Sequence, residues 1–442
     1  MNEKTLTHAV ILPVEGRTVI QDGMIVIRDS RIAYVGPMDP GRAAGEEISC
    51  AGKLLMPGLV NTHAHSGSTL FRSIADDLFL MDWLENYMWP IEKHQTAAFS
   101  RTASALCHLE FLKNGITTHA DMWIYGSSTA KAALESGLRS VICPTVFSRP
   151  STETDDPLSA SMEFTETWAG REEETRIYPG IGPHAVYSCT QETLRKVADF
   201  AKKHHILIHT HISETRQENI DCRERLGMTP TEAMLNAGIF ENKVVAAHCV
   251  HMTDSDWRIM RDHGAAVSYN PVSNLKLVSG IMDLHAALEN GVCVSIGTDG
   301  PQSNNSLDLL RDLKTGSLIQ KNARMDPTFF PAEAAVRMAT VEGARALGLE
   351  DEIGTLKEGK KADIIALDLR DPELTPAHTG NFGNLCSLIV YAASGRNVCD
   401  VFVDGECLMK DRIPCRIDVP ALLKEAKEMA DFMIRKSGFK MK

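Results

Sequence analysis

The sequence predicts an α/β protein in which a (β/α)8 barrel of the TIM type is joined to a small β-sandwich built from both chain ends. Eight short apolar runs alternate with helical stretches between residues 57 and 358, which is the pattern of a parallel barrel. Segments rich in strand and turn signals stand on both sides of this region. An open doubly wound sheet is the alternative, but no Gly-x-Gly-x-x-Gly phosphate loop follows any of the apolar runs.

The two ends of the chain are expected to form the sandwich. Residues 1–56 contain alternating runs such as Met24–Ile27 and Arg31–Val35, which are separated by Asp-Gly and Gly-Pro turn signals. Residues 359–412 contain similar alternating runs and turn signals, for example in Asp400–Gly405. Because chain ends commonly lie close together, we expect these two segments to pair in one small domain.

The barrel domain is expected over residues 57–358, and residues 413–442 are expected to form a helical extension after Pro420. The eight strands are predicted at Gly58–Asn61, Ile116–Asp121, Ser140–Phe147, Ile177–Gly182, Ile206–His211, Val244–His248, Ala265–Tyr269 and Val292–Thr298. Polar residues follow the C-terminal ends of these strands, at His65, Asp121, His184, His211, His248 and Asp299. Active sites of this fold are built at that end of the barrel from several strands at once.

Composition excludes several classes of partner. The 442 residues carry a net charge of −12 with no basic cluster, so binding to a nucleic-acid backbone is not expected. No uninterrupted apolar stretch approaches the roughly 20 residues that span a bilayer, so no membrane segment is expected. The N-terminus resembles no secretory signal, and the eleven cysteines are scattered without a Cys-x-x-Cys pair, which favours a cytoplasmic protein with reduced thiols.

Histidine and acidic residues at the strand ends together suit one divalent metal ion. His63 and His65 share a face of their strand because positions i and i+2 point to the same side, so both side chains point into the barrel. His209 and His211 also share a face, and the strand end favours His211 as the ligand. With Asp299 the set has three imidazoles and one carboxylate, which suits a metal with an open position for water.

Two further side chains have the chemistry to act beside such a metal. Glu214 follows His211 by three residues, and a carboxylate there can take a proton from water and pass it to a leaving group. His248 ends the sixth strand and can orient a hydroxide or the developing negative charge. Asp299 would also suit a helix N-cap, since Ser303 and two asparagines follow. Water on a metal loses its proton near neutral pH, so the set predicts a hydrolase or a deaminase.

Other residues are expected to contact a substrate. The apolar positions of Leu80–Glu92 fit a helix over the barrel mouth; packing explains most of them, and Trp83 is expected to wall an aromatic ligand. Glu92 lies off this stripe, where a carboxylate can accept two sugar hydroxyls. His184 is placed to hydrogen-bond the substrate, with a structural role in the turn as the alternative. No lysine that would bridge two metals lies near His184, so one ion is expected.

These segments resemble the amidohydrolase superfamily, in the branch of aminohydrolases and chlorohydrolases of nitrogen heterocycles. The resemblance spans nearly the whole chain and rests on Pro57–Phe71, Gly115–Met122, His211–Glu214, Ala247–His251, Ser268–Gly280 and Gly297–Leu307. Finer matches resemble the 5'-methylthioadenosine/S-adenosylhomocysteine deaminases, and these are Trp83, Trp89–Glu92, Gly182–His184 and Asn270–Leu277.

The resemblance implies a metal and a reaction. It implies one Zn2+ per subunit on His63, His65, His211 and Asp299, although Fe2+ or Mn2+ can occupy similar sites. Hydroxide would attack C6 of an adenine ring, Glu214 would protonate N1, and Asp299 would assist proton delivery to the departing ammonia, leaving an inosine-type product. Substrate contacts are implied or expected for Glu92 at the ribose diol, His184 at the purine, and Trp83, Arg149 and Ser303. A homodimer or homotetramer is expected from the family.

One departure from the family narrows the expected substrates. Members that accept S-adenosylhomocysteine carry arginines in and after the third strand, which hold the amino-acid carboxylate. Here that strand contains Ile142–Val146 without an arginine, and Arg149 follows in the loop. Because a buried carboxylate without a guanidinium partner is costly, we expect 5'-methylthioadenosine, 5'-deoxyadenosine or adenosine rather than S-adenosylhomocysteine.

Two other functions are compatible with the same pattern. A hydrolase of another nitrogen heterocycle, such as an s-triazine chlorohydrolase or aminohydrolase, or a guanine or pterin deaminase, would share the metal set. Glu92 and His184 favour the nucleoside over these substrates. A non-catalytic scaffold of the same fold is the more remote alternative, and it would be expected to have lost ligands that are all present here.

Overall fold

The computed structural model describes residues 3–14, 18–149, 156–380 and 383–438. The chain divides into two compact units, each of which is described by itself. Unit 1 comprises residues 1–61, 109–118 and 308–417, and unit 2 comprises residues 62–108, 119–307 and 418–442. The domain boundaries expected from the sequence stay a prediction.

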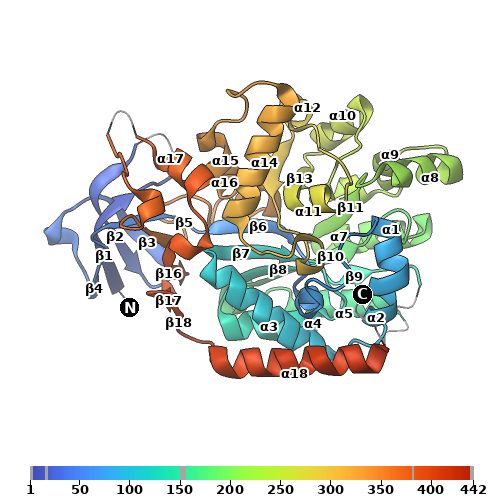
Figure 1. Ribbon diagram of the computed structural model, residues 1–442, viewed down its shortest axis with the longest axis horizontal. Helices are drawn as coiled ribbons and strands as arrows, with labels where there is room; N and C mark the ends of the chain where they lie inside the picture. The colour runs from blue at the N-terminus through green and yellow to red at the C-terminus, as the bar shows by residue number, and fades with distance from the viewer. Residues whose placement is uncertain (1–2, 15–17, 150–155, 381–382, 439–442) are drawn as a thin grey trace. The chain divides into compact units, whose positions relative to one another are not determined.

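Unit 1 holds one mixed sheet to which both ends of the chain contribute strands (Figure 1). Its order is β18-β17-β16-β15-β5-β1-β2-β3, with β4 beside β1. The two ends meet where β15 pairs antiparallel with β5, with Ile364 opposite Pro57. Leu6, Leu55 and Phe402 lie in the core of this unit. The strands are β1 (Glu3–Ile11), β2 (Ile20–Arg28), β3 (Arg31–Pro37), β4 (Glu46–Ser49), β5 (Lys53–Pro57), β15 (Ile364–Asp368), β16 (Val398–Val403), β17 (Glu406–Lys410) and β18 (Ile413–Pro414).

The pairing of both chain ends in one sheet confirms the expectation from their alternating apolar pattern. Unit 1 also contains four α-helices among its described residues, and these are α14 (Leu309–Arg324), α15 (Ala332–Met338), α16 (Val341–Leu347) and α17 (Leu385–Ser387). Short turns of 3-10 or π type are η1 (Pro40–Arg42), η5 (Pro372–Leu374), η6 (Leu388–Ala392) and η7 (Gly395–Asn397).

Eight parallel strands form a nearly closed barrel in the order β6-β7-β8-β10-β11-β12-β13-β14, which confirms the predicted fold class. An isolated parallel bridge joins Ala64, at the end of β6, to Asp299, and the Asp299 N–H donates to the His63 carbonyl at 3.0 Å. The strands are β6 (Leu59–Ala64), β7 (Ile116–Asp121), β8 (Arg139–Ile142), β10 (Ile177–Pro183), β11 (Leu207–Ile212), β12 (Val244–His248), β13 (Ala266–Tyr269) and β14 (Cys293–Ile296).

The third predicted strand, Ser140–Phe147, is interrupted in the structure. It consists of β8 and a separate two-residue strand, β9 (Thr145–Val146), which also pairs with β10. Pro144 lies between the two pieces and has no N–H to donate to a ladder, so a continuous strand cannot form there.

Helices of unit 2 follow the barrel strands along the chain. They are α3 (Ala97–Lys113, which runs on into unit 1), α4 (Gly126–Ser136), α5 (Pro157–Trp168), α6 (Glu172–Thr175), α7 (Gln191–His204), α8 (Arg216–Leu226), α9 (Pro230–Asn236), α10 (Asp254–Asp262), α11 (Pro271–Lys276), α12 (Leu284–Glu289) and α13 (Pro301–Asn304). Two 3-10 turns are η2 (Ser66–Phe71) and η4 (Ile239–Glu241). Within the described residues, no helix combines the length and the apolar character that crossing a bilayer requires.

The segment expected as one helix over Leu80–Glu92 is helical but not uniform. It begins as α1 (Leu80–Trp83), widens to a π-helical turn η3 (Leu84–Met88), and ends as α2 (Trp89–Glu92). The N–H of Trp89 donates to the Leu84 carbonyl, five residues back. Pro90 has no N–H, and its ring would crowd the carbonyl four residues before it in a regular α-helix, which accounts for the wider turn.

The predicted C-terminal helix is present as α18 (Val419–Ser437), which lies along α3 (Figure 1). Ala426 and Met433 pack in one apolar cluster with Met88, Ile91 and Phe99. Thr102 of α3 donates a hydrogen bond from its hydroxyl to the Glu425 carboxylate at 2.7 Å. The helix therefore covers the segment that carries Leu80–Glu92.

Loss of this packing should destabilise the protein. Met433 is 2 % exposed, and removal of a buried methionine side chain costs about 2–5 kcal/mol in the free energy of unfolding. We expect Met433→Ala to lower that free energy by this amount in urea denaturation, whereas Leu423→Ala, at a residue of the same helix that is 50 % exposed, should change it by about 0.5 kcal/mol or less. Equal effects of the two changes would contradict the docking of α18.

Candidate metal centre and substrate pocket

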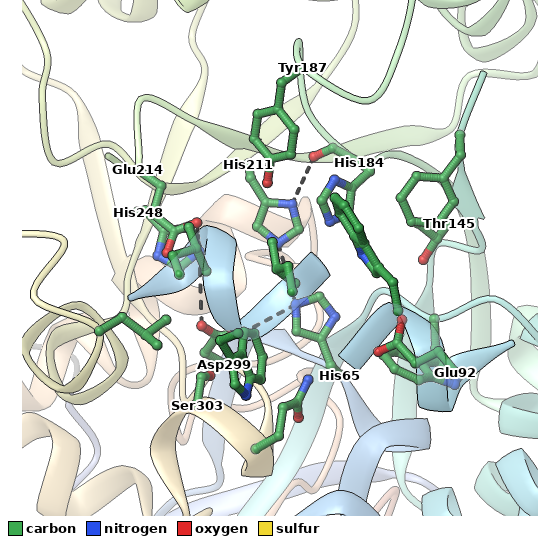
Figure 2. Close-up of a pocket in the computed structure, with 18 of the residues that line it drawn as sticks. His65, Glu92, Thr145, His184, Tyr187, His211, Glu214, His248, Asp299 and Ser303 are labelled. Atoms are coloured by element: carbon green, nitrogen blue, oxygen red, sulfur yellow. Dashed lines mark hydrogen bonds and ion pairs between the residues drawn. The ribbon is translucent and has the colours of Figure 1, made fainter. Parts of the chain in front are cut away.

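The ends of β6 and β11 and the residue Asp299 beyond β14 bring the predicted metal ligands together in unit 2. Figure 2 shows His65, His211 and Asp299 of this set. His63 lies within β6, and His65 follows it at the start of η2. His211 belongs to β11, and Asp299 follows β14. The alternation of β6 explains how His63 and His65 reach the same space, with ring centroids 4.7 Å apart.

The donor atoms of these residues have the spacing of a tetrahedral coordination shell. His65 Nε2 lies 3.3 Å from His211 Nε2 and 3.3 Å from Asp299 Oδ1, and His63 Nε2 lies 3.4 Å from the same oxygen. Four ligands on a tetrahedral metal with bonds of about 2.0–2.1 Å are roughly 3.3–3.4 Å apart. These three separations are those of neighbouring ligands on one divalent ion.

Hydrogen bonds on the outer side of each ring direct the Nε2 atoms inward. His65 Nδ1 donates to the Met122 carbonyl at 2.7 Å, and His211 Nδ1 donates to the His184 carbonyl at 2.8 Å. A carbonyl only accepts, so in the neutral rings the lone pairs of both Nε2 atoms face each other. Such lone pairs repel at this distance unless a positive charge lies between them.

Charge within the cluster agrees with a cation site. Burial lowers the pKa of His63 to about 4, so this ring is neutral and available as a ligand. Burial opposes ionisation of Asp299, but the His63 and His65 rings hold the pKa of its carboxyl well below the usual range. Burial also disfavours a charged His65, yet the Asp299 carboxylate raises its pKa. The arrangement thus stabilises positive charge between the rings and the carboxylate.

A second layer of side chains holds the ligands. His209 Nε2 contacts His63 Nδ1 at 2.8 Å, on the side of the His63 ring away from Nε2. The Ser273 hydroxyl donates to Asp299 Oδ2 at 2.5 Å. The backbone N–H of Gly300 donates to Asp299 Oδ1 at 2.6 Å. Gly300, not Asp299, is the N-cap of α13, so the N-cap alternative for Asp299 is wrong.

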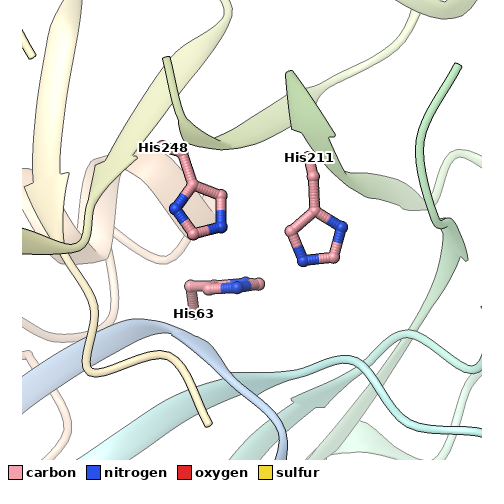
Figure 3. A group of neighbouring side chains, drawn as sticks. All are labelled: His63, His211 and His248. Atoms are coloured by element: carbon pink, nitrogen blue, oxygen red, sulfur yellow. The ribbon is translucent and has the colours of Figure 1, made fainter. Parts of the chain in front are cut away.

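His248 is a fourth imidazole, and it lies beside His63 and His211 (Figure 3). One ring nitrogen of each of these three histidines lies within 4.8 Å of the other two. Its Nε2 lies 4.0 Å from Asp299 Oδ2 and 3.8 Å from Glu214 Oε2, which is longer than the tetrahedral edge. Asn274 Oδ1 lies 2.7 Å from its Nδ1 and fixes the ring. This position suits contact with a group in the open position more than it suits a ligand.

Glu214 completes the charged part of the site. It follows β11 and is 5 % exposed, and the Ser279 hydroxyl donates to its Oε1 at 3.3 Å. Burial raises the pKa of Glu214 above its ordinary value. A raised pKa favours the protonated carboxyl, which is the form that donates a proton in general acid–base chemistry.

Left-handed backbone conformations occur at these strand ends. Ser213 has φ 50°, His248 φ 73° and Asp299 φ 62°, and none of them is a glycine. Such conformations are uncommon for residues with a side chain and cluster at functional sites, where the surroundings hold them.

The cluster opens into a pocket of about 690 Å³, including its mouth (Figure 2). Nine of the eleven residues predicted for the site line it: His65, Trp83, Glu92, His184, His211, Glu214, His248, Asp299 and Ser303. His63 lies in the cluster beneath them. Arg149 is not among the described lining residues; it is exposed, and its guanidinium lies 4.4 Å from the ring centroid of Trp89 at the pocket wall.

The pocket is mainly aromatic and apolar away from the metal ligands. Phe147 lies 4.8 Å from the His184 ring, and Tyr187 lies 5.6 Å from it on another side, measured between centroids. Burial lowers the pKa of His184 to about 3, so this ring is neutral. Burial raises the pKa of Glu92 to about 7. The remaining lining residues are Leu80, Leu84, Trp89, Trp123, Ile124, Thr145, Leu277 and Gln302.

Several residues of the site were not predicted from the sequence. Trp123 and Gln302 line the pocket, and Ser68 hydrogen-bonds the Gln302 side chain. Trp123 follows Asp121 at a strand end, a position that could have drawn attention to it. Nothing in the sequence distinguishes Gln302 or Ser279 from other polar loop residues.

Fold and site together define a (β/α)8-barrel protein with a centre suited to a divalent metal at the C-terminal ends of its strands. The chain belongs to the amidohydrolase family, since the model described as "Amidohydrolase family" matches residues 54–408. A 5-methylthioadenosine/S-adenosylhomocysteine deaminase of Desulforudis audaxviator is 39 % identical over 432 residues, 97 % of this chain and 98 % of that protein. A 5'-deoxyadenosine deaminase of Methanosarcina mazei is 39 % identical over 416 residues, 94 % of each chain.

Solved structures of other proteins share the fold of this chain. An adenosine deaminase from Xanthomonas campestris with bound zinc superposes with a TM-score of 0.93 at 29 % identity, over 98 % of this chain and 99 % of that one. An atrazine chlorohydrolase from Arthrobacter aurescens in complex with zinc superposes with a TM-score of 0.88 over 97 % and 100 %, at 23 % identity, and this likeness shows the fold alone.

Metal binding should depend on the converging ligands and not on histidines nearby. We expect the purified protein to hold about one divalent ion per chain, and His65→Ala or Asp299→Asn to lower this to about a tenth or less, since each removes or weakens one of the four predicted ligands. His251→Ala is the matched control, because His251 binds the Ser279 carbonyl at 2.7 Å instead. Elemental analysis after dialysis measures the content, and retention of metal by both ligand variants would contradict the assignment.

Proposed function

We propose that this protein is a zinc-dependent deaminase of adenosine-type nucleosides with an uncharged 5' group. The substrates would be 5'-methylthioadenosine, 5'-deoxyadenosine or adenosine, and the products the inosine analogue and ammonia. The observation that carries the proposal is the buried Glu214 carboxyl beside the His65–His211–Asp299 cluster, at the base of an aromatic pocket. The names of the relatives, which include 5'-deoxyadenosine deaminase and adenosine deaminase, support the same substrate class.

The pocket walls suit a planar heterocycle. Trp83, Trp123, Phe147 and Tyr187 supply broad apolar faces, and aromatic faces stack favourably on rings. His184 supplies a neutral polar edge for a ring nitrogen. The base would therefore lie among the aromatic side chains with one edge toward His65 and Glu214.

Glu92 supports a sugar on this base. In Figure 2 it lies across the pocket from Glu214 and His248, with His65 between them. A nucleoside with its base at the metal centre would direct its ribose to this far side. The carboxylate can accept hydrogen bonds from both the 2' and 3' hydroxyls.

The 5' group is expected to be uncharged. No lysine or arginine occurs among the described lining residues, and Arg149 lies outside them against Trp89. A carboxylate in such a pocket would lose its hydration without gaining a cationic partner. S-Adenosylhomocysteine is therefore the less favoured substrate.

The residues of the chain would divide the chemistry as follows. His63, His65, His211 and Asp299 would hold the zinc ion, which lowers the pKa of water and so supplies a hydroxide nucleophile at neutral pH. Glu214 would deliver a proton to the ring nitrogen next to the reacting carbon, as the non-ligand glutamate does in other zinc deaminases. His248, held by Asn274, would stabilise the charge that develops beside Asp299.

A substrate screen tests the proposal directly. The zinc-loaded protein would be assayed for ammonia release with adenosine, 5'-methylthioadenosine, 5'-deoxyadenosine, S-adenosylhomocysteine, guanine and a triazine. We expect one of the first three to have the highest kcat/KM, at least about tenfold above S-adenosylhomocysteine, which is about 1.4 kcal/mol. Turnover of guanine or the triazine alone would refute the nucleoside assignment.

The proposed contact of Glu92 with the ribose diol can be measured by changing Glu92 in the enzyme and by removing the two hydroxyls from the substrate. Hydrogen bonds to a charged group contribute about 1.5–3 kcal/mol, so we expect Glu92→Gln to lower kcat/KM for adenosine by about 10- to 100-fold. The same variant should change kcat/KM for 2',3'-dideoxyadenosine by about twofold or less, because that substrate has no diol. Glu85→Gln, at an exposed position of the same helical segment, is the control. Equal losses with both substrates would exclude a diol contact.

A further inference from the structure

A second buried carboxyl group lies directly behind Glu214. Glu218 is on the first turn of α8 and is 5 % exposed. Its Oε2 accepts a hydrogen bond from the backbone N–H of Glu214 at 2.8 Å. Its Oε1 is buried, and no described residue hydrogen-bonds it. Burial raises the pKa of Glu218 to about 8, although the hydrogen bond from the Glu214 N–H opposes this shift.

The hydrogen bond acts on the turn that carries Glu214. β11 ends at Ile212, and Ser213 then takes a left-handed conformation with φ 50°. The Ser213 carbonyl accepts the N–H groups of Val250 at 3.1 Å and His251 at 2.9 Å. The peptide group between Ser213 and Glu214 is therefore held at both of its polar atoms. Its carbonyl oxygen accepts the two N–H groups, and its N–H donates to Glu218. From this backbone the Glu214 carboxyl accepts a hydrogen bond from the Ser279 hydroxyl and lies 3.8 Å from His248 Nε2.

This bond differs from ordinary helix capping. In α9, Glu232 accepts the N–H of the N-cap residue Thr229 at 2.7 Å, and the Thr229 hydroxyl accepts the N–H of Glu232 in return. In α8 the N-cap hydroxyl of Thr215 likewise accepts the N–H of Glu218 at 3.1 Å. The Glu218 carboxyl, however, reaches one residue beyond the cap, to Glu214. A glutamate at the third position of the helix, which caps the helix in α9, therefore binds the backbone of Glu214 in α8.

We propose that Glu218 is a positioning residue, which fixes the backbone of Glu214 so that the Glu214 carboxyl is held in place for proton transfer to the substrate. This inference rests on the proposed function. A small displacement of a reacting group can cost about 100-fold in rate, so the contribution is measurable.

Two variants and a matched control test it in the zinc-loaded protein. We expect Glu218→Ala to lower kcat about 100-fold, with KM within about threefold of wild type and the metal content unchanged. Glu218→Gln should stay within about fivefold of wild-type kcat, because the amide oxygen can accept the same N–H. Glu232→Ala removes the corresponding bond in α9, away from the described pocket lining, and should leave kcat within about twofold. Equal kcat values for Glu218→Ala and Glu232→Ala, or a Gln variant as slow as the Ala variant, would overturn the proposal.

Amide hydrogen exchange separates this inference from the proposed function. In Glu218→Ala the peptide that contains Glu214 should exchange faster than in wild type, and in Glu232→Ala only the peptide at the start of α9 should do so. Absence of nucleoside turnover in the wild-type protein would refute the proposed function and leave this readout intact. Unchanged exchange at Glu214 in Glu218→Ala would overturn the positioning role.

Discussion

The close approach of two histidine nitrogens at the ends of the barrel strands is the constraint on which the site in unit 2 depends. His65 Nε2 and His211 Nε2 are 3.3 Å apart. In each ring the proton is on Nδ1, which donates it to a backbone carbonyl. Without a cation between them, this arrangement would be repulsive in neutral rings. The buried Asp299 carboxylate, whose Oδ1 lies 3.3 Å from His65 Nε2, supplies one negative charge toward a divalent ion at the base of the pocket.

The order of the strands determines how each ligand is held. His65, after β6, is oriented by the Met122 carbonyl after the neighbouring strand β7. His211, on β11, is oriented by the His184 carbonyl after the neighbouring strand β10. Both carbonyl groups come from positions just past the ends of the strands, and the His184 carbonyl also accepts the backbone N–H of His211 at 3.1 Å. Barrel topology thus selects the tautomer of the ligands, which a side-chain partner would do less rigidly.

The parts of the site that depend on periodicity could be predicted from the sequence. His63 and His65 share a face because a strand has a period of two residues, and the strand ends at His211 and His248 follow from the apolar runs before them. The barrel and the pairing of both chain ends followed in the same way from alternating and apolar runs.

The remaining features depend on contacts between loops that are distant in sequence. Ser279 reaches Glu214 across 65 residues, and Ser68 reaches Gln302 across 234, so no local pattern marks either pair. Glu218 has the sequence pattern of a helix cap, and only the coordinates show that its carboxyl reaches Glu214. The break at Pro144 and the π turn before Pro90 follow from the missing N–H groups, although the length of each irregularity depends on its neighbours.

Anomalous X-ray scattering from crystals of the zinc-loaded protein, recorded on both sides of the zinc absorption edge, tests the central claim most directly. The account predicts one strong zinc peak per chain, within about 2.0–2.2 Å of the Nε2 atoms of His63, His65 and His211 and of one Asp299 oxygen, with His248 farther away. A peak bound by His248 in place of Asp299, or no peak among these residues, would contradict it.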